Sequence, residues 1–214
     1  MKRFIILICV ITLSTLTFAD NIAEDLINKL RSGDGVDDTI VWKSFEKYKG
    51  DKKIQKQLIE KLQGKTNVAD KLRCIRVLGK IGDEYSVKPL LIMLEHKDMY
   101  IRTQTAESLG EIGSGSSSTV NGLLEVLKDT EIGVVEASVE ALGRIGGSEV
   151  ITPLLELLRH PNPIIRWKTV TALGDINDKG VIGKLEDMEK TEKNNMVRVA
   201  IKETLEKLKK PGEY

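Results

Sequence analysis

Aromatic residues and cysteines are scarce in this chain of 214 residues. Phe, Trp and Tyr make up 4% of it, and Cys9 and Cys74 are its two cysteines. A framework of several disulfides is therefore excluded, so a protein of this length must be held together by apolar packing. Leu, Ile, Val and charged residues dominate instead, a balance that is typical of helices packed through aliphatic stripes.

Long hydrophobic runs are absent except for one short run at the N-terminus. Lys2 and Arg3 precede the apolar residues 4–16, and residues 17–19 (Thr-Phe-Ala) form a small-residue cleavage site before Asp20. A membrane anchor is the alternative, but a bilayer span needs about 20 apolar residues. The sequence therefore predicts that the first 19 residues are a signal peptide. The mature protein is then exported, periplasmic or secreted, with no membrane span after cleavage.

Net charge of either sign is also small. The formal charge is +1, and loss of Lys2 and Arg3 with the signal peptide changes it to −1. Nucleic-acid binding depends on neutralised phosphates, so no nucleic-acid partner is expected. We find no Gly-rich phosphate loop, nucleophile elbow or paired metal ligands. The sequence thus predicts no catalytic residues, no cofactor, no metal and no enzyme activity.

An internal repeat organises most of the chain. The segment VLGKIG at 77–82 returns as SLGEIG at 108–113, ALGRIG at 141–146 and ALGDIN at 172–177. Its leucines are 78, 109, 142 and 173, with a degenerate fifth at 205, so the spacings are 31, 33, 31 and 32. A second leucine-rich marker falls between these segments, at 90–94, 123–127 and 154–158. Each period therefore holds two short helices.

The apolar residues of each period follow helical spacing. Ile101, Thr105 and Leu109 share one face of the first helix, and Val87 and Leu90 share one face of the second. The predicted fold class is all-α: a right-handed α-solenoid of stacked antiparallel helix pairs, HEAT-like, with a period of about 31–33 residues. We assign residues 65–214 to this array and residues 20–64 to a divergent N-terminal helical cap. The cap is expected to contain helices at 21–31, 40–49 and 54–62.

These segments resemble the HEAT repeat, in particular the short phycobilisome-lyase-type HEAT-like repeat. Its pattern is approximately V-R-x-x-A-A-x-A-L-G-x-I-G-D followed by a leucine-rich helix, and the resemblance covers about residues 70–210. It departs from the pattern at Val135, where Arg is usual, and at Lys71, which replaces Arg in the first repeat. The resemblance implies a protein-binding surface and, in a subset of the family, attachment of bilin pigments. A pigment-handling protein is not expected to carry an export signal.

Three arginines recur at the start of the first helices, namely Arg102, Arg166 and Arg198. A row that binds anions is one interpretation. The resemblance favours a structural one, in which each guanidinium bonds to a carboxylate or carbonyl of the preceding turn and locks the stacking. Asp98 and Asn162, four residues upstream, are the expected partners of two of them.

His96, His160 and Cys74 are the remaining candidates for chemistry. The two histidines occupy equivalent positions two repeats apart, and neighbouring helices pack about 8–10 Å apart. One metal ion therefore cannot bind both, and we expect them to act as cations at helix ends. Cys74 lies in a column of small residues and is expected to pack between helices rather than to react.

A surface for a partner protein is predicted on the second helices, because these line the concave side of HEAT-like arrays. The alternative is that its acidic residues form i,i+3 pairs, Glu125 with Lys128 and Glu156 with Arg159. Trp167 is added as an outward-facing anchor. The predicted partner-binding residues are Ile92, His96, Glu125, Asp129, Glu156, His160, Glu186 and Trp167.

Three functions remain open from the sequence. The main one is an exported HEAT-repeat scaffold that mediates protein–protein interaction without catalysis of its own. The second is a lyase-like or tetrapyrrole-attachment factor of the HEAT-like family. The third is a structural component that assembles end to end, because residues 42–76 carry eleven bases and four acids whereas residues 107–158 carry two bases and nine acids. The partner and the oligomeric state stay open.

Overall fold

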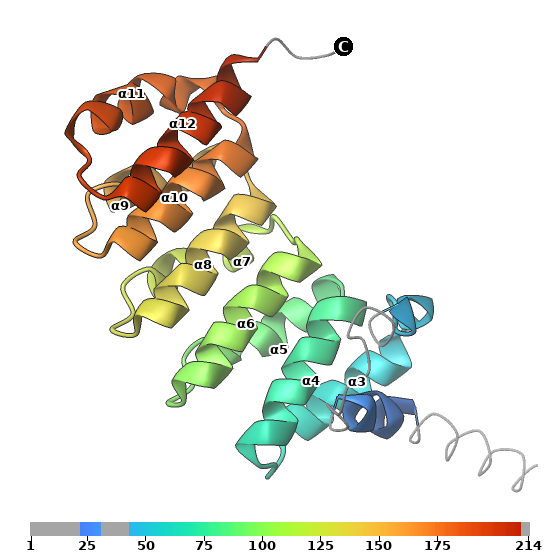
Figure 1. Cartoon of the computed structure of the whole chain (residues 1–214). Coiled ribbons are helices and arrows are strands. Elements are labelled where there is room, and N and C mark those ends of the chain that lie inside the picture. The colour runs from blue at the N-terminus through green and yellow to red at the C-terminus, as the bar shows by residue number, and fades with distance from the viewer. Residues whose placement is uncertain (1–21, 31–42, 211–214) are drawn as a thin grey trace, which may run out of the picture. The chain divides into compact units, whose positions relative to one another are not determined.

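The regular structure of the chain is helical throughout the residues that the computed structural model describes, which are 22–30 and 43–210 (Figure 1). Residues 22–29 are helical. The other α-helices are α3 (Lys52–Gln63), α4 (Val68–Ile81), α5 (Glu84–Met93), α6 (Met99–Ile112), α7 (Ser117–Val126), α8 (Ile132–Ile145), α9 (Ile151–Leu157), α10 (Pro163–Ile176), α11 (Ile182–Thr191) and α12 (Asn195–Lys209). Short 3-10 turns are η1 (Glu46–Tyr48), η2 (Ser148–Val150) and η3 (Lys179–Val181). The predicted signal peptide lies outside the described residues. None of the helices within them is long and apolar enough to cross a bilayer.

The chain divides into two compact units, and the N-terminal unit extends to Pro89. In it α3 packs against α4, which confirms the helix predicted at 54–62. The Asp51 carboxylate starts α3 by accepting hydrogen bonds from the backbone N–H of Lys53 (2.9 Å) and Ile54 (3.1 Å). The helix predicted at 40–49 is wrong where it can be tested, because its second half is only the 3-10 turn η1. The chain reverses at Gly50, whose φ of +78° is a left-handed conformation that favours glycine.

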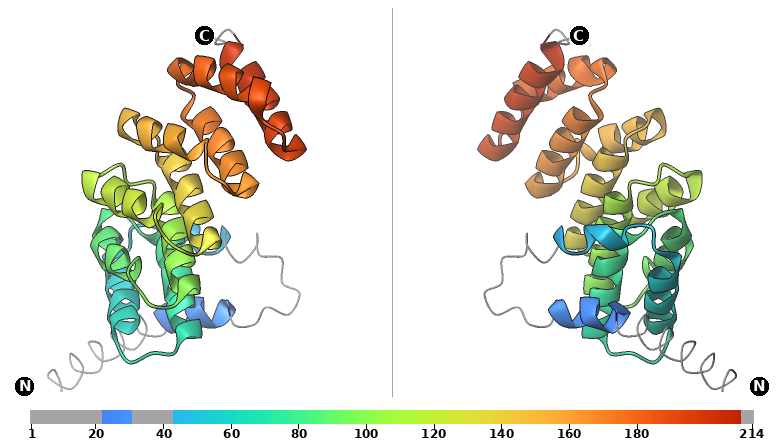
Figure 2. Two further views of the ribbon diagram at one scale, coloured as in Figure 1. Left: turned by 90° about the vertical axis from the view of Figure 1, so that its left-hand side faces the viewer. Right: turned by 90° about the vertical axis from the view of Figure 1, so that its right-hand side faces the viewer.

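The C-terminal unit, from Leu90 on, is a stack of helix pairs. The first helices of the pairs form one layer, in which α6 packs on α8, α8 on α10 and α10 on α12. The second helices α7, α9 and α11 form the other layer, as Figure 2 shows. Each helix pair is antiparallel and joined by a short turn. The predicted fold of stacked helix pairs is confirmed.

An aliphatic spine fills the space between the two layers. The marker leucines of the first helices, Leu109, Leu142 and Leu173, are fully buried. So are Leu123, Leu154 and Leu185 of the second helices. Each fully buried leucine contributes roughly 1.5–3 kcal/mol relative to an exposed one, so the repeat that marks the sequence is also the main source of stability.

Glycines after the marker leucines let adjacent first helices approach each other closely. A Cβ on Gly110 would lie 2.8 Å from the Cβ of Ala141, and one on Gly143 would lie 2.8 Å from the Cβ of Ala172. At Gly174 the nearest atom would be Cγ2 of Thr204, at 2.9 Å. These distances are shorter than carbon atoms tolerate, so the glycines set the spacing of the stack.

We predict that adding one methyl group at this contact destabilises the stack. Gly143→Ala should lower the free energy of unfolding by about 1–3 kcal/mol, because overpacking of a tight contact outweighs the gain in helix propensity. Gly133→Ala makes the same change in the same helix, but a Cβ there meets no atom within 4 Å. That control should keep or slightly raise the stability. Urea unfolding followed by circular dichroism measures both, and equal effects of the two substitutions would refute the close-approach role.

Candidate ligand groove and partner surface

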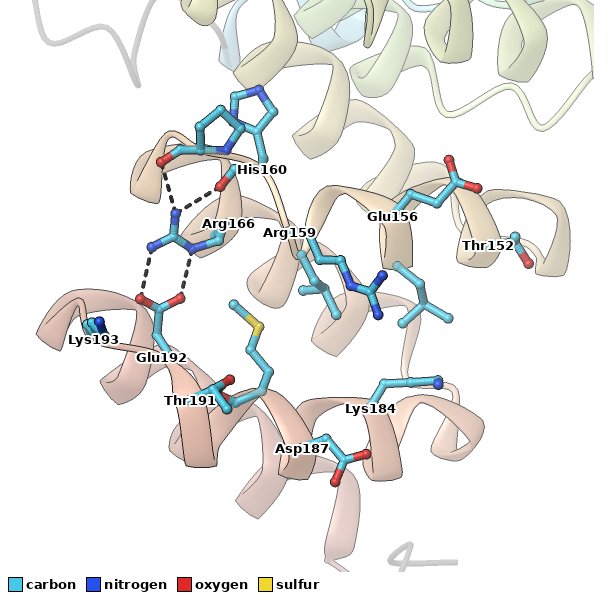
Figure 3. A pocket seen from close by; sticks show the side chains of 14 residues that line it. Thr152, Glu156, Arg159, His160, Arg166, Lys184, Asp187, Thr191, Glu192 and Lys193 are labelled. Carbon is cyan, nitrogen blue, oxygen red and sulfur yellow. Dashed lines mark hydrogen bonds and ion pairs between the residues drawn. The ribbon is translucent and has the colours of Figure 1, made fainter.

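A clamp of charged groups joins the last two repeats. The Arg166 guanidinium donates to both carboxylate oxygens of Glu192, from Nε at 2.7 Å and from Nη2 at 2.9 Å (Figure 3). Its Nη1 donates to the carbonyl oxygens of His160 (2.8 Å) and Pro161 (3.1 Å). The side chains of both charged residues are largely buried, at 17% and 5% exposed. A bidentate, charge-assisted pair of this kind fixes the position of both loops.

The same clamp occurs one double repeat earlier. The Arg102 guanidinium bonds both oxygens of Asp129 at 2.7 and 2.9 Å, and its Nη1 donates to the carbonyl of His96 at 2.9 Å. The hydrogen bonds from arginine are the main reason why the pKa of Asp129 and that of Glu192 lie below their usual values. The structural interpretation of the recurring arginines is thus confirmed for these two.

The partners predicted for these arginines are wrong. Asp98 and Asn162 instead start α6 and α10, since their side chains accept hydrogen bonds from backbone N–H groups of those helices. The carboxylate comes from the loop of the following repeat, 27 residues after Arg102. In the first repeat, Lys71 replaces the arginine by donating to the carbonyls of Leu62 and Gly64.

One loop position alternates between a histidine and an acid along the array. Nδ1 of His96 accepts from the backbone N–H of Asp98 (3.0 Å), and Nδ1 of His160 accepts from that of Asn162 (3.1 Å). The carboxylates of Asp129 and Glu192 accept equivalent hydrogen bonds from the backbone N–H of the residue two positions later in the chain. Each ring therefore supports its turn through Nδ1, and the role expected for the two histidines as helix-end cations stays a prediction.

A groove of ≈ 920 Å³ lies between α9 and α11, within the C-terminal unit. We call it the α9–α11 groove. Its apolar wall is Leu155, Leu158 and Met188, and the Arg166–Glu192 clamp borders the end near the loops (Figure 3). Its polar lining is Thr152, Glu156, Arg159, His160, Lys184, Asp187, Thr191 and Lys193. The volume is within the range of small-molecule sites, roughly 300–1,000 Å³.

Cations without a partner point into the α9–α11 groove. Arg159 reaches from the end of α9 and Lys184 from α11 into the space between the helices, and Glu156 points away from Arg159 (Figure 3). Neither Arg159 nor Lys184 has a hydrogen-bonded or ion-paired partner among the described residues. Asp187 is paired with Lys190 at 2.9 Å. The groove therefore presents uncompensated positive charge beside apolar surface, which is suited to an anionic ligand with an apolar body.

The predicted partner-binding residues are only partly available. Ile92 is 55% exposed, and Glu125 is exposed in an i,i+3 pair with Lys128 at 3.0 Å, so the alternative of local pairing holds there. Asp129 is wrong as a contact residue, because its side chain is 12% exposed and holds Arg102. No pair between Glu156 and Arg159 forms among the described residues.

Glu186 and Trp167 also lie differently from the expectation. Glu186 bonds Lys209 of α12 at 2.7 Å, so it faces the helix behind it. Leu185 is buried like Leu154, so the two leucines are equivalent and Asp187 is the counterpart of Glu156. The leucine pattern of α11 is too weak to show this alignment in the sequence. Trp167 is half-buried, and the Lys168 ammonium lies 4.6 Å from the centre of its ring.

Cys74 is fully buried in α4, which confirms its packing role. Burial raises the pKa of its thiol from 9.0 to about 11. The thiolate is the reactive form of cysteine. Cys74 is therefore held in its less reactive form within the N-terminal unit, and it is not among the residues that line the α9–α11 groove.

Comparison with known proteins places these features in a family. A family model described as HEAT repeats matches residues 56–140 and 120–206. The phycocyanobilin lyase subunit alpha of Picosynechococcus sp. is 31% identical over 108 residues, which are 46% of this chain and 40% of that protein. The subunit of the same name from Microchaete diplosiphon is 30% identical over 142 residues, 59% of this chain and 48% of that protein. The chain thus spans less than half the length of these curated relatives.

Solved structures agree on the fold. The complex of CpcE and CpcF of phycocyanin lyase from Nostoc sp. PCC7120 matches with a TM-score of 0.55 and 23% identity, over 83% of this chain and 74% of that one. A designed armadillo repeat protein in complex with the peptide (KR)4 has a TM-score of 0.52 and 17% identity, over 86% and 98%. At these identities the likeness supports the fold alone.

The comparisons confirm the resemblance to phycobilisome-lyase-type repeats and correct one expectation. The sequence predicted no enzyme activity because it contains no recognisable catalytic motif. That prediction is wrong, since the curated relatives are named lyase subunits. A motif search misses such proteins because a ligand groove assembled from several repeats leaves no local signature in the sequence.

We predict that the clamp makes stability depend on pH. The pKa of Glu192 is lowered in the folded state, so its stabilisation is complete above the ordinary value of about 4.3 and is lost as the pH falls through the folded value. Glu192→Gln should cost about 1–3 kcal/mol at neutral pH and show a smaller loss of stability on acidification than the wild type. Urea unfolding at a series of pH values checks this. Glu125→Gln, an exposed carboxylate, is the control that should behave like the wild type; identical pH curves for all three proteins would contradict the prediction.

We also predict that Cys74 is unreactive in the folded protein. A pKa of about 11 lowers its thiolate fraction about 100-fold, and burial blocks access as well. In a Cys9→Ser background, a thiol reagent should modify Cys74 only as fast as the N-terminal unit opens. Ser118→Cys, placed at an exposed position, should react at once. Rapid labelling of Cys74 without denaturant would disprove its burial.

Proposed function

Because the chain belongs to the HEAT-repeat family, we propose that it acts as a lyase-type subunit that binds a linear tetrapyrrole in the α9–α11 groove. Two lines of support meet here. The curated relatives at 30% and 31% identity are named phycocyanobilin lyase subunit alpha. The α9–α11 groove also combines apolar walls with unpaired cations, which is the chemistry that such a pigment requires.

The pigment's structure explains the fit to the groove. A linear tetrapyrrole has a flat, conjugated body of four rings and two propionate carboxylates. Leu155, Leu158 and Met188 offer apolar surface for the rings. Arg159 and Lys184 can each bond one carboxylate, and Lys193 lines the same groove. Charge-assisted hydrogen bonds of this kind contribute roughly 1.5–3 kcal/mol each.

One observation carries the proposal: Arg159 and Lys184 come from different helices, point into one apolar groove and lack partners among the described residues. Two other cations of the last repeats are already paired. Arg166 is clamped by Glu192, and Lys190 is paired with Asp187. Unpaired cations beside apolar surface favour an anionic ligand, because its charge would neutralise the site.

A protein partner completes the proposed role. The relatives are named subunits, and the matching solved structure is a complex of two chains. We propose the exposed row of Ile92, Glu125 and Glu156 on the second helices as the surface for such a partner. Export stays a prediction from the first 19 residues alone.

We predict that this protein binds biliverdin, a readily available linear tetrapyrrole, with a change in its absorption spectrum. Arg159→Glu and Lys184→Glu should each weaken binding about tenfold or more, because each replaces an attraction to a carboxylate by a repulsion. Titration followed by absorbance and by isothermal calorimetry gives the dissociation constants.

Two control variants sharpen this experiment. Lys128→Glu makes the same charge change at the position of α7 that corresponds to Arg159, outside the groove, and should leave binding unchanged. Cys74→Ala should also bind normally, because the thiol does not line the groove. Absence of binding by the wild-type protein, or equal weakening by Lys128→Glu and Arg159→Glu, would overturn the assignment of the pigment site to this groove.

A further inference from the structure

The two walls of the α9–α11 groove have little direct contact with each other. The helix α9 packs chiefly on α10, and α11 packs chiefly on α12. Direct packing between α9 and α11 is minor, which leaves the space of the groove between them. The distance between the walls is therefore set from outside them, by the packing of α10 on α12 and by polar contacts at the helix ends.

Arg166 of α10 makes the polar contact at one end of the groove. Its guanidinium donates to the carbonyl oxygens of His160 and Pro161, which follow α9, and to both carboxylate oxygens of Glu192, which ends α11 (Figure 3). The carboxylate of Glu192 also accepts a hydrogen bond from the backbone N–H of Asn194 at 2.8 Å. One side chain thus bonds the chain at the end of both walls.

The residues that Arg166 holds are direct chain neighbours of cations in the groove. Arg159 immediately precedes His160 after α9. Lys193 immediately follows Glu192 after α11, and both cations line the groove. The clamp therefore fixes the backbone from which one cation of each wall extends. Binding sites need their groups held to within about 0.5 Å, so a wall that shifts by more than this changes how the cations meet a ligand.

The same arrangement of clamp and groove occurs between α5 and α7. Arg102 donates to two carbonyl oxygens of the loop after α5, those of His96 and Lys97. It also bonds both carboxylate oxygens of Asp129, which follows α7. Asp129 is among the residues that line a groove between these two helices. Each of the two grooves is thus bordered at its loop end by an arginine that bonds both walls.

The repeat between the two clamps shows that the fold does not need a clamp at every junction. In α8 the buried Val135 takes the position of the arginine, and in the next loop His160 takes the position of the acid. The backbone N–H of Asn162 donates to Nδ1 of His160, just as that of Asn194 donates to Glu192. The helices α8 and α10 still pack against each other. Stacking alone therefore does not explain why the clamps stand beside the two grooves.

We propose that Arg166 and Glu192 are positioning residues of the α9–α11 groove. Their clamp holds the ends of α9 and α11 at the spacing that lets Arg159 and Lys184 bond one ligand together. This role rests on the proposed binding of a linear tetrapyrrole in the groove. Arg166 makes four hydrogen bonds inside the clamp with its five N–H groups. It therefore acts through the two walls and has little left to offer a ligand directly.

The repeat without a clamp supplies the test, because it shows which pair of residues can replace one. Arg166→Val together with Glu192→His copies that repeat in the full chain. The exchange removes one charge of each sign, so it leaves no buried charge unpaired. It should weaken biliverdin binding about tenfold or more, because the walls lose their common anchor. Titration followed by absorbance gives the dissociation constants, and circular dichroism should show the helix content of the wild type.

Two control variants separate positioning from general stability. Arg102→Val with Asp129→His makes the same exchange at the first clamp, so it should cost similar stability and leave the affinity for biliverdin unchanged. Glu192→Asp keeps an acid in the clamp, as the first clamp does, and should retain most of the wild-type affinity. Wild-type affinity after the exchange at Arg166 and Glu192, or an equal loss after both exchanges, would overturn the positioning role.

A measurement without ligand separates this role from the proposed function. Spin labels on Thr152→Cys of α9 and Gly183→Cys of α11, in a Cys9→Ser background, report the distance between the walls by pulsed electron paramagnetic resonance. Both positions are exposed, and Cys74 is fully buried. The distance distribution should become about twofold broader when the clamp is exchanged. A wild-type chain that does not bind biliverdin would refute the pigment site alone, whereas an unchanged distribution would overturn the role of the clamp whether or not the pigment binds.

Discussion

No helix pair of the C-terminal unit can bury its aliphatic face alone, and this constraint governs the rest of the structure. Leu109, Leu142 and Leu173 leave water only because the neighbouring pair covers them. The free energy gained by burying apolar surface has no preferred direction. It therefore does not determine the position of one helix pair along its neighbour. Two directional features determine that position. The glycines permit one close approach for each pair of first helices, and the arginine clamps tie a turn to the loop of the following repeat.

The alternation of the clamp follows from charge balance at one loop position. Where the preceding first helix carries Arg102 or Arg166, the next loop supplies Asp129 or Glu192. In α8 the arginine is replaced by Val135, which is buried, and the next loop carries His160. A carboxylate there would lack its cation and would be held only by the backbone N–H that His160 now accepts. A largely buried acid without a cation is costly, so a histidine at this position avoids that cost while still accepting the backbone hydrogen bond.

Periodicity carried the fold prediction a long way, and its failures share one physical cause. Spacing along the chain shows which residues share a helix face, so the buried leucines were predicted correctly. It does not show which side chain reaches across to the next repeat. Asp98 was expected to bind Arg102 because it is close in sequence, whereas the bound acid is Asp129 of the following repeat. The prediction for Glu186 was wrong for a related reason. Because α11 has few leucines, its sequence was aligned one residue out of register with the other second helices. Glu186 was therefore expected on the partner surface, whereas it bonds Lys209.

The candidate ligand site was beyond the reach of the sequence because it depends on differences between equivalent positions. The groove between α5 and α7 is built like the α9–α11 groove, but it has Glu95 and Gly122 at the positions that Arg159 and Lys184 occupy in the α9–α11 groove. It is lined by Glu95 and Glu125, and Lys128 is neutralised by Glu125. Two copies of one scaffold thus differ in the sign of their unpaired charge. The stacking residues could not vary in this way, because each is held by a neighbour in the next repeat. Arg159 and Lys184 of the α9–α11 groove have no bonded partner among the described residues, so the array can change what it binds while its core stays the same.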